Sequence, residues 1–128
     1  MNFISSEMKK ENLILDRTFD FALKIIELYK LMAEQREYVL SKQILRSGTS
    51  IGANVEEATA AYSKKDFAAK MSIASKEARE TRYWLRLIDK SQIANVYVKE
   101  YLDEVEHIVN ILTAIVKTSQ KELRNVEC

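Results

Sequence analysis

The sequence predicts an all-α protein, an antiparallel up-down-up-down four-helix bundle, and three observations carry this prediction. The 128 residues include no proline and only two glycines, although strand-rich domains need such residues in their turns. Apolar residues recur at helical spacing through four long segments. The connections between these segments are short, which makes successive helices antiparallel. The length fits a single domain, residues 1–128, with one hydrophobic core.

The first predicted helix covers about residues 6–33 and carries two adjacent apolar seams. We expect both seams to lie within one wide stripe that faces the core. The first seam consists of Leu15, Phe19, Ala22, Ile26 and Tyr29. The second seam consists of Ile14, Phe21, Ile25, Leu28 and Met32. Charged residues take the opposite face, at Arg17, Asp20, Lys24, Glu27 and Lys30.

The other three helices show the same amphipathic pattern. The second covers about residues 36–62, with an inward seam of Leu40, Ile44, Ser47, Ile51, Val55, Ala58 and Tyr62. The third covers about residues 63–89 and begins with Ser63 as N-cap, three residues before Asp66. Its inward residues are Phe67, Met71, Ala74, Ala78, Thr81, Leu85 and Ile88. The fourth covers about residues 95–123, with Asn95 as its cap and Val98, Leu102, Val105, Val109, Leu112 and Val116 inward.

Composition excludes several classes of protein. The net charge is only +1, so no global field draws the chain to nucleic acid or to an acidic membrane. Cys128 is the one cysteine, which excludes an internal disulfide and fits a reducing cytoplasm. The first ten residues lack the apolar core of a signal peptide, and no apolar run reaches the roughly 20 residues that span a bilayer. We therefore expect a cytoplasmic protein without a membrane partner.

The segment from Arg46 to Ala58 is rich in small residues and contains both glycines, Gly48 and Gly52. Glycine within a helix costs up to about 1 kcal/mol relative to alanine, so close packing has to offset it. Part of this segment faces the core. A second face is a candidate oligomer interface, and its residues are Arg46, Ser50, Ala53 and Glu57. The alternative is tight packing within one chain, which we favour for Gly48.

The third helix concentrates positive charge. Between Ser63 and Ser91 there are eight basic and four acidic residues, a net charge of +4, which leaves −3 for the rest of the chain. The candidate nucleic-acid-binding residues on this stripe are Lys76, Arg79, Arg82, Tyr83 and Arg86. The backbone phosphates of a nucleic acid would contact the basic side chains, and Tyr83 offers a ring on which a nucleobase could stack. The alternative is a solvated face whose arginines pair with acids on a neighbouring helix or subunit.

Two charged residues of the third helix, Lys70 and Glu77, fall within its apolar arc near Trp84. An unpaired charge there would be costly, so we expect each to be paired or to lie at an edge.

The sequence offers little catalytic chemistry. Glu104 and His107 form one Glu-x-x-His motif of the kind that binds two metals in bundles, but His107 is the only histidine. Cys128 is terminal, no Ser-His-Asp set can be assembled, and no glycine-rich phosphate loop is present. We therefore expect no enzyme, no catalytic residue, no metal and no cofactor. A metal-dependent enzyme that uses Glu104 and His107 is the alternative.

Two blocks of this sequence resemble a known family. The first is Gln43-Ile44-Leu45-Arg46-Ser47 followed by Ser50-Ile51-Gly52-Ala53-Asn54-Val55-Glu56-Glu57-Ala58. The second is Asp66-Phe67 followed by Ile73-Ala74-Ser75-Lys76-Glu77-Ala78-Arg79-Glu80-Thr81-Arg82-Tyr83-Trp84-Leu85. Both are similar to signatures of the 23S rRNA intervening-sequence protein family, also called the four-helix-bundle protein family.

The resemblance implies a small bacterial protein with an antiparallel four-helix fold and a ring-like homo-oligomer, a pentamer. Family members are often encoded within sequences inserted in large-subunit ribosomal RNA genes. Related accessory proteins of diversity-generating retroelements bind nucleic acid and a reverse transcriptase, but they are markedly basic. Matching positions at Asn54, Glu57, Glu80 and Trp84 imply shared packing or assembly.

Three functions follow from these observations as expectations. The first is a non-enzymatic, homo-oligomeric scaffold or RNA-associated accessory protein, whose partners are other copies of the chain and RNA or a nucleic-acid-associated protein. The second is a protein-binding adaptor without nucleic-acid contact. The third is the metal-dependent enzyme.

Overall fold

The computed structural model describes the backbone of residues 2–127 and the side chains of residues 13–125. Four helices make up the fold: α1 (Asn2–Glu34), α2 (Leu40–Thr59), α3 (Lys64–Ser91) and α4 (Lys99–Glu127). No strand occurs within the described backbone. The prediction of an all-α protein with four long helices is confirmed.

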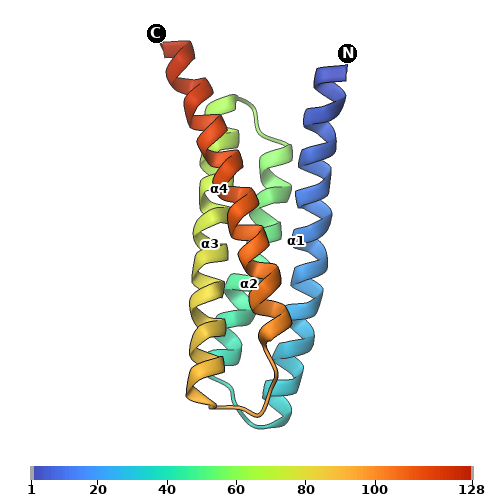
Figure 1. The fold of residues 1–128 in the computed structure, drawn as a ribbon, viewed down its shortest axis with the longest axis vertical. Helices are drawn as coiled ribbons and strands as arrows, with labels where there is room; N and C mark the ends of the chain where they lie inside the picture. The colour runs from blue at the N-terminus through green and yellow to red at the C-terminus, as the bar shows by residue number, and fades with distance from the viewer. Residues whose placement is uncertain (1, 128) are drawn as a thin grey trace.

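The four helices lie side by side around a common core (Figure 1). α2 packs against both α1 and α3, and α3 packs against α4. α1 also contacts α4, which closes the bundle, and this pair of helices makes fewer contacts than the other three pairs. Both chain ends and the α2–α3 connection lie at one end of the molecule, and the other two connections lie at the opposite end.

The predicted start of the second helix at residue 36 is wrong, because Arg36 has a φ of 63° and the chain turns there. α2 begins instead at Leu40, after the buried side chain of Glu37 folds back over its first turn. The Glu37 carboxylate accepts the backbone N–H of Val39 at 3.1 Å and of Ser41 at 2.8 Å. These bonds satisfy donors that have no partner within the helix.

The predicted cap of the third helix is confirmed, because the Ser63 hydroxyl accepts the backbone N–H of Asp66 at 3.1 Å. The predicted cap at Asn95 is wrong, since α4 begins only at Lys99. Asn95 has a different role: its N–H donates to Gln35 Oε1 at 2.6 Å and its carbonyl accepts from Gln35 Nε2 at 2.8 Å. This pair of bonds joins the α1–α2 and α3–α4 connections.

The core uses one seam of α1 rather than two. The second seam is buried, at Ile14, Phe21, Ile25, Leu28 and Met32. The first seam is half-buried at Leu15, Ala22, Ile26 and Tyr29, and Phe19 is 63% exposed. Residues two apart on a helix point about 200° from each other, so Phe19 and Phe21 cannot both face one core. Placing the first seam in the core was therefore wrong for Phe19.

The inward residues of the other helices are mostly as predicted. The buried ones are Ile44, Ser47, Ile51, Val55, Ala58, Met71, Ala74, Ala78, Thr81, Leu85, Ile88, Val98, Val105, Val109 and Leu112. Tyr62 was placed in the α2 seam and is instead fully exposed, because α2 ends at Thr59. Ile108 completes the α4 contribution to the core and was not anticipated.

Candidate interaction surfaces

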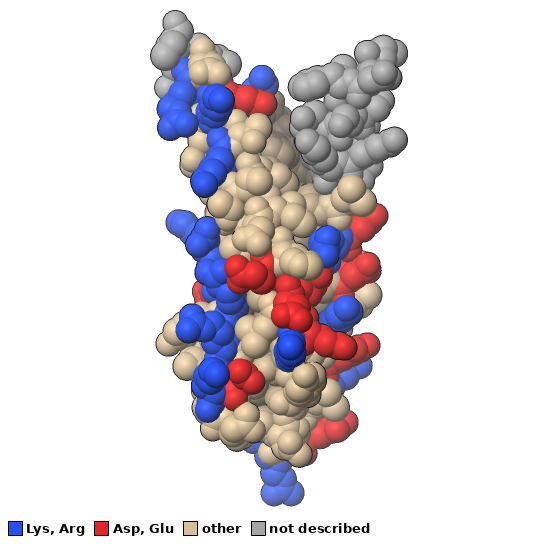
Figure 2. Space-filling view, viewed as in Figure 1, with Lys and Arg blue, Asp and Glu red and all other residues tan. Residues whose placement is uncertain are grey.

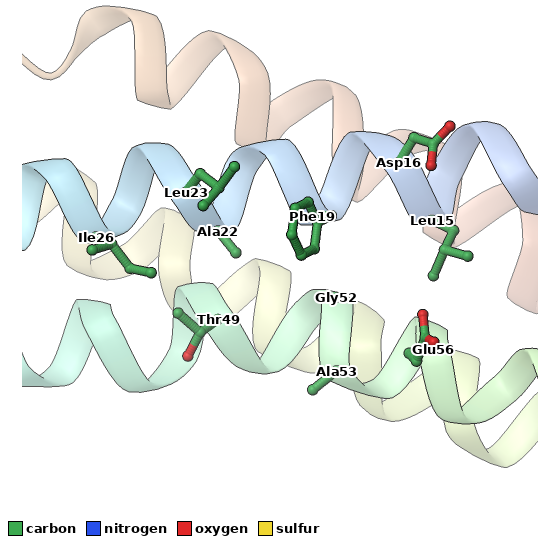
Figure 3. Close-up of a pocket in the computed structure, with 10 residues that line it drawn as sticks. All are labelled: Leu15, Asp16, Phe19, Ala22, Leu23, Ile26, Thr49, Gly52, Ala53 and Glu56. Atoms are coloured by element: carbon green, nitrogen blue, oxygen red, sulfur yellow. The ribbon is translucent and has the colours of Figure 1, made fainter.

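An open apolar groove of about 540 Å³ runs between α1 and α2 (Figure 3). Phe19, Ala22 and Ile26 point from α1 toward α2, whereas Asp16 and Leu23 point away from it. The α2 side and the remainder of the wall come from Leu15, Thr49, Gly52, Ala53 and Glu56. Most of the wall is apolar, and Asp16 and Glu56 add acidic groups at the upper end of the groove, which is the end nearest the chain termini.

The groove continues onto an apolar strip on the outward side of α1. Four large apolar residues are exposed there, and we call them the α1 strip: Leu13, Phe19, Leu23 and Leu31. The side chain of Leu23, for example, is 50% exposed. Exposed charged residues, among them Asp16, Asp20, Glu27 and Lys30, interrupt the strip, so α1 is apolar toward the core and mixed on its outward side. Large apolar residues exposed together on one side of a helix are typical of contact surfaces, which makes the α1 strip a candidate for such a surface.

The predicted oligomer interface on α2 is divided by the structure. Ala53 is exposed and lines the groove. The hydroxyl of Ser50 donates to the Arg46 carbonyl at 2.6 Å. Arg46 itself reaches α3, where its guanidinium bonds the carboxylates of Glu77, at 3.4 Å, and Glu80. Of the four predicted residues, Ala53 therefore faces the groove and Ser50 bonds its own helix. The charged residues, Arg46 and Glu57, pair with α3.

A polar seam joins α2 to α3. Lys70 Nζ lies 2.9 Å from Glu57 Oε2, and this hydrogen bond raises the pKa of Lys70 above its ordinary value. Trp84 donates its indole N–H to Glu80 at 3.0 Å. The expectation that Lys70 and Glu77 would be paired is confirmed. Glu80 and Trp84 belong to one network with Arg46, so their matching positions in the family signature have a structural role in this chain.

Asn54, the remaining signature residue, is half-buried on α2. Its side-chain N–H donates to the Ser50 carbonyl one turn earlier at 2.8 Å. The amide therefore has the hydrogen-bond partner that burial requires.

Basic residues gather along the edge where α3 meets α4 (Figure 2). Arg82 is bonded to Glu106 of α4 at 3.0 Å, and Arg79 donates to the Thr113 hydroxyl at 3.1 Å. These contacts show that the α4-facing side of α3 adjoins the face of α4 that carries Glu106 and Thr113. The same face of α4 continues with three exposed basic residues at helical spacing, Lys117, Lys121 and Arg124.

We call this surface the basic seam, and it consists of Arg79, Arg82, Arg86, Lys117, Lys121 and Arg124. The α3 half was predicted from the sequence. The α4 half was not, because acidic residues earlier in α4 mask the basic cluster in the net charge of that helix. The signal was the spacing of the three basic residues. Among the described side chains, Arg86 and the three α4 residues have no ion-pair partner.

The remaining predicted residues of the α3 stripe have distinct settings. Lys76 is exposed, and Tyr83 is exposed while its ring packs edge-on against Trp84, with centroids 5.3 Å apart. Tyr83, Arg86, Leu87 and Lys90 line a shallow recess of about 170 Å³. The predicted stripe therefore splits into a side that faces α4 and a side that faces outward.

Glu104 and His107 lie at the α1–α4 seam. Arg17 Nε is 2.7 Å from Glu104 Oε2, and Arg17 Nη2 is 3.2 Å from His107 Nδ1. The hydrogen bond to Glu104 raises the pKa of Arg17. A cation that used Glu104 and His107 as ligands would have to displace this guanidinium. Within residues that the structure describes, no three metal-ligating side chains cluster, and Cys128 lies outside those residues.

Each helix within the described residues is too short or too polar to cross a membrane. The fold and surfaces define a four-helix protein with an apolar groove on one side and a basic seam on another. The comparisons with known proteins identify its family. The model of the 23S rRNA-intervening sequence protein matches residues 10–114, and the chain belongs to this family.

A similar solved structure is a protein of unknown function from the S23 ribosomal protein family of Bacteroides thetaiotaomicron VPI-5482. The two sequences are 46% identical, the match covers 84% of this chain and 98% of that chain, and the TM-score is 0.78. No curated protein matches the chain. The family resemblance predicted from the two sequence blocks is confirmed.

Proposed function

We propose that the protein is a non-enzymatic, homo-oligomeric scaffold with an RNA-associated accessory role in the cytoplasm of a bacterium. The observation that carries the proposal is the separation of two exposed surfaces. The α1 strip and groove are apolar and suit protein contact. The basic seam lies on another pair of helices and suits phosphate contact. A scaffold needs both kinds of surface at once.

The scaffold is an up-down-up-down antiparallel bundle. Short connections and the placement of both chain ends beside the α2–α3 connection support this topology. The copies close into a ring, and a pentamer is the state that the family resemblance implies. The groove, with Ala53 in its wall, supplies a surface through which copies associate.

RNA associates through the basic seam. Its two halves place basic groups on adjacent helices, so a phosphate backbone can follow the edge of the bundle for several nucleotides. Tyr83 is exposed beside Arg86 and offers a ring face for an unpaired base. The bonds of Arg79 and Arg82 to α4 hold these side chains in place and leave further guanidinium N–H groups for phosphate.

The test measures binding of a single-stranded RNA by the full chain at several salt concentrations. One variant replaces Arg79, Arg82 and Arg86 by alanine, a second replaces Lys117, Lys121 and Arg124, and a control replaces Lys24 and Lys30 of α1. We expect steep salt dependence for wild type, with a slope that falls by roughly one for each lost phosphate contact. Equal binding by wild type and both seam variants would remove RNA from the proposal.

A protein-binding adaptor is the second candidate, and the apolar groove is the observation that favours it. In that case the ring presents its surfaces to another protein and no nucleic acid is involved. Co-purification of a partner from the native host that resists nuclease treatment favours the adaptor. Loss of the partner after nuclease treatment favours the RNA-associated role.

Absence of enzymatic activity is part of the proposal. It is supported by the engagement of Glu104 and His107 with Arg17, which uses both side chains for packing α1 against α4. Metal analysis of the purified protein tests it. Stoichiometric iron, manganese or zinc that disappears in a Glu104→Gln variant would contradict it.

A further inference from the structure

A second exposed surface lies on α3. The outward side of α3 next to α2 carries Ile73, Lys76, Leu87 and Lys90, and we call it the α3 ridge. Its orientation follows from Glu80, which bonds Arg46 of α2. Ile73, Lys76 and Leu87 are seven or four residues from Glu80 and therefore share its side of the helix. Ile73 is a large apolar residue of this ridge and is 40% exposed.

The α1 strip and the α3 ridge span the same levels of the bundle. Ile25 of α1 contacts Gly48 of α2, and the adjacent Ser47 bonds Thr81 of α3 at 2.9 Å, which fixes the level of Ile25 near that of Thr81. Both helices start from the end that holds the chain termini and rise equally per residue. Asp20 is therefore level with residues near Lys76, and Leu31 is level with residues near Leu87.

Charge is complementary at the level of Asp20 and Lys76. Asp16 and Glu56 line the upper end of the groove, and Asp20 follows Asp16 by one turn on the outward side of α1. The ridge carries Lys76 at the level of Asp20, and the described side chains offer Lys76 no ion-pair partner. Opposite charges at one level favour contact between the two faces.

The groove and the ridge both lean toward α2. α2 supplies one wall of the groove, and the ridge lies on the α2 side of α3. The two faces are therefore not diametrically opposed, and copies joined groove to ridge follow a curved path. A contact between two different faces excludes a two-fold dimer and forms a ring when the rotation between copies closes.

We propose that the groove and α1 strip of one copy bind the α3 ridge of a second copy, with Asp20 facing the neighbour's Lys76. The proposal rests on the homo-oligomer of the proposed function and names the two surfaces that form it. It leaves the part of the basic seam that faces α4, Arg79 and Arg82 with the three basic residues of α4, open to RNA.

Light scattering of purified full-length variants, combined with size-exclusion chromatography, tests the proposal. Wild type elutes as a multiple of the 14.8 kDa protomer. Asp20→Lys and Lys76→Glu each place like charges together and weaken association by at least about tenfold. The double variant, Asp20→Lys with Lys76→Glu on one chain, restores opposite charges between copies and returns association to within about threefold of wild type.

The two positions lie on non-adjacent helices of one chain, so restoration reports contact between copies. Asp103→Lys and Lys99→Glu on α4 are matched charge reversals of exposed residues outside both faces and outside the basic seam, and they leave the mass unchanged. Leu23→Asp on the exposed strip yields monomers, and far-ultraviolet circular dichroism verifies that its helicity matches wild type.

The outcomes separate this inference from the proposed function. Monomeric wild type overturns both. An oligomeric wild type whose mass is unaffected by Leu23→Asp and by either charge reversal keeps the scaffold and overturns the groove-to-ridge contact. So does a Lys76→Glu variant that keeps its mass and loses only RNA, because the ridge then belongs to nucleic acid. Additive losses in the double variant overturn the Asp20–Lys76 pairing.

Discussion

Gly48 of α2 lies directly against Ile25 of α1, and a Cβ added to Gly48 would be 2.8 Å from Ile25 Cγ2. Gly52, one turn later, has a different neighbour, since its Cβ would be 3.3 Å from the backbone carbonyl oxygen of Thr18. The two glycines let the α1 and α2 backbones come close together. This contact offsets the intrinsic cost of glycine in a helix and also sets the floor of the groove.

Replacing Gly48 by alanine lowers the free energy of unfolding by about 1 kcal/mol. Overpacking against Ile25 costs about 1–3 kcal/mol, and the better helix propensity of alanine returns up to about 1 kcal/mol. Gly52→Ala changes stability by less than about 0.5 kcal/mol, because its milder contact nearly cancels that gain. Urea unfolding measures both. Ala53→Gly, at an exposed position, is the control and loses about 1 kcal/mol; equal effects at both glycines would contradict the contact with Ile25.

A buried hydroxyl pair between α2 and α3 gives a second prediction. Ser47 Oγ lies 2.9 Å from Thr81 Oγ1, and both residues are fully buried. Thr81→Val keeps the shape and leaves the Ser47 hydroxyl without this partner, which costs about 1–3 kcal/mol. Adding Ser47→Ala to Thr81→Val removes both polar groups, so the double variant is more stable than the sum of the singles indicates. Denaturant unfolding of wild type, Thr81→Val, Ser47→Ala and the double variant measures the coupling. Strict additivity of the two single changes would show that the hydroxyls do not interact.

Helical periodicity is sufficient to predict four helices and most of the core in this chain. Buried residues such as Ile44, Leu85 and Val105 each stand on a single apolar face, so the period identifies them. α1 differs because apolar residues occupy more than one face. Periodicity identifies both seams there but cannot tell which one faces the core and which one is exposed, as Phe19 shows.

Some helix ends and parts of the surface clusters are set by contacts between residues far apart in the sequence, so local patterns did not predict them. Gln35 and Asn95 are 60 positions apart, so no local pattern reveals that Asn95 ties two connections rather than capping α4. The basic seam arises where Arg79 meets Thr113 across two helices. The small residue Gly48 did indicate close packing, because side-chain size is local information, whereas contact between copies through Ala53 stays a prediction.

The cap of α2 gives a third prediction. Glu37 accepts the N–H groups of Val39, Leu40 and Ser41 at 3.1, 3.3 and 2.8 Å. Glu37→Ala leaves these donors unpaired at the start of the helix, and we expect a loss of about 1–2 kcal/mol. Glu34→Ala, an exposed acid at the end of α1, is the control and changes stability by less than about 0.5 kcal/mol. Thermal or urea unfolding decides, and equal effects of both variants would exclude the capping role.

Tyr101 on α4 gives a pH-dependent prediction. Burial raises its pKa above the ordinary value of 10.0, and the nearby carboxylates of Glu27 and Glu100 raise it further. The unfolded chain therefore loses the Tyr101 proton at lower pH than the folded protein does. Its contribution to stability is complete below the unfolded pKa and is lost as pH rises through the folded pKa.

Unfolding measured between pH 8 and about pH 11 tests this sign. Tyr101→Phe keeps the ring and removes the ionisable hydroxyl, so its stability falls less steeply above about pH 10 than that of wild type. Below about pH 9 the two curves run parallel, because the hydroxyl is protonated in both folded and unfolded chains. Tyr62→Phe is the matched control, since Tyr62 is fully exposed and its replacement leaves the wild-type curve unchanged. A Tyr101→Phe curve that overlays wild type throughout would show that burial does not perturb this phenol.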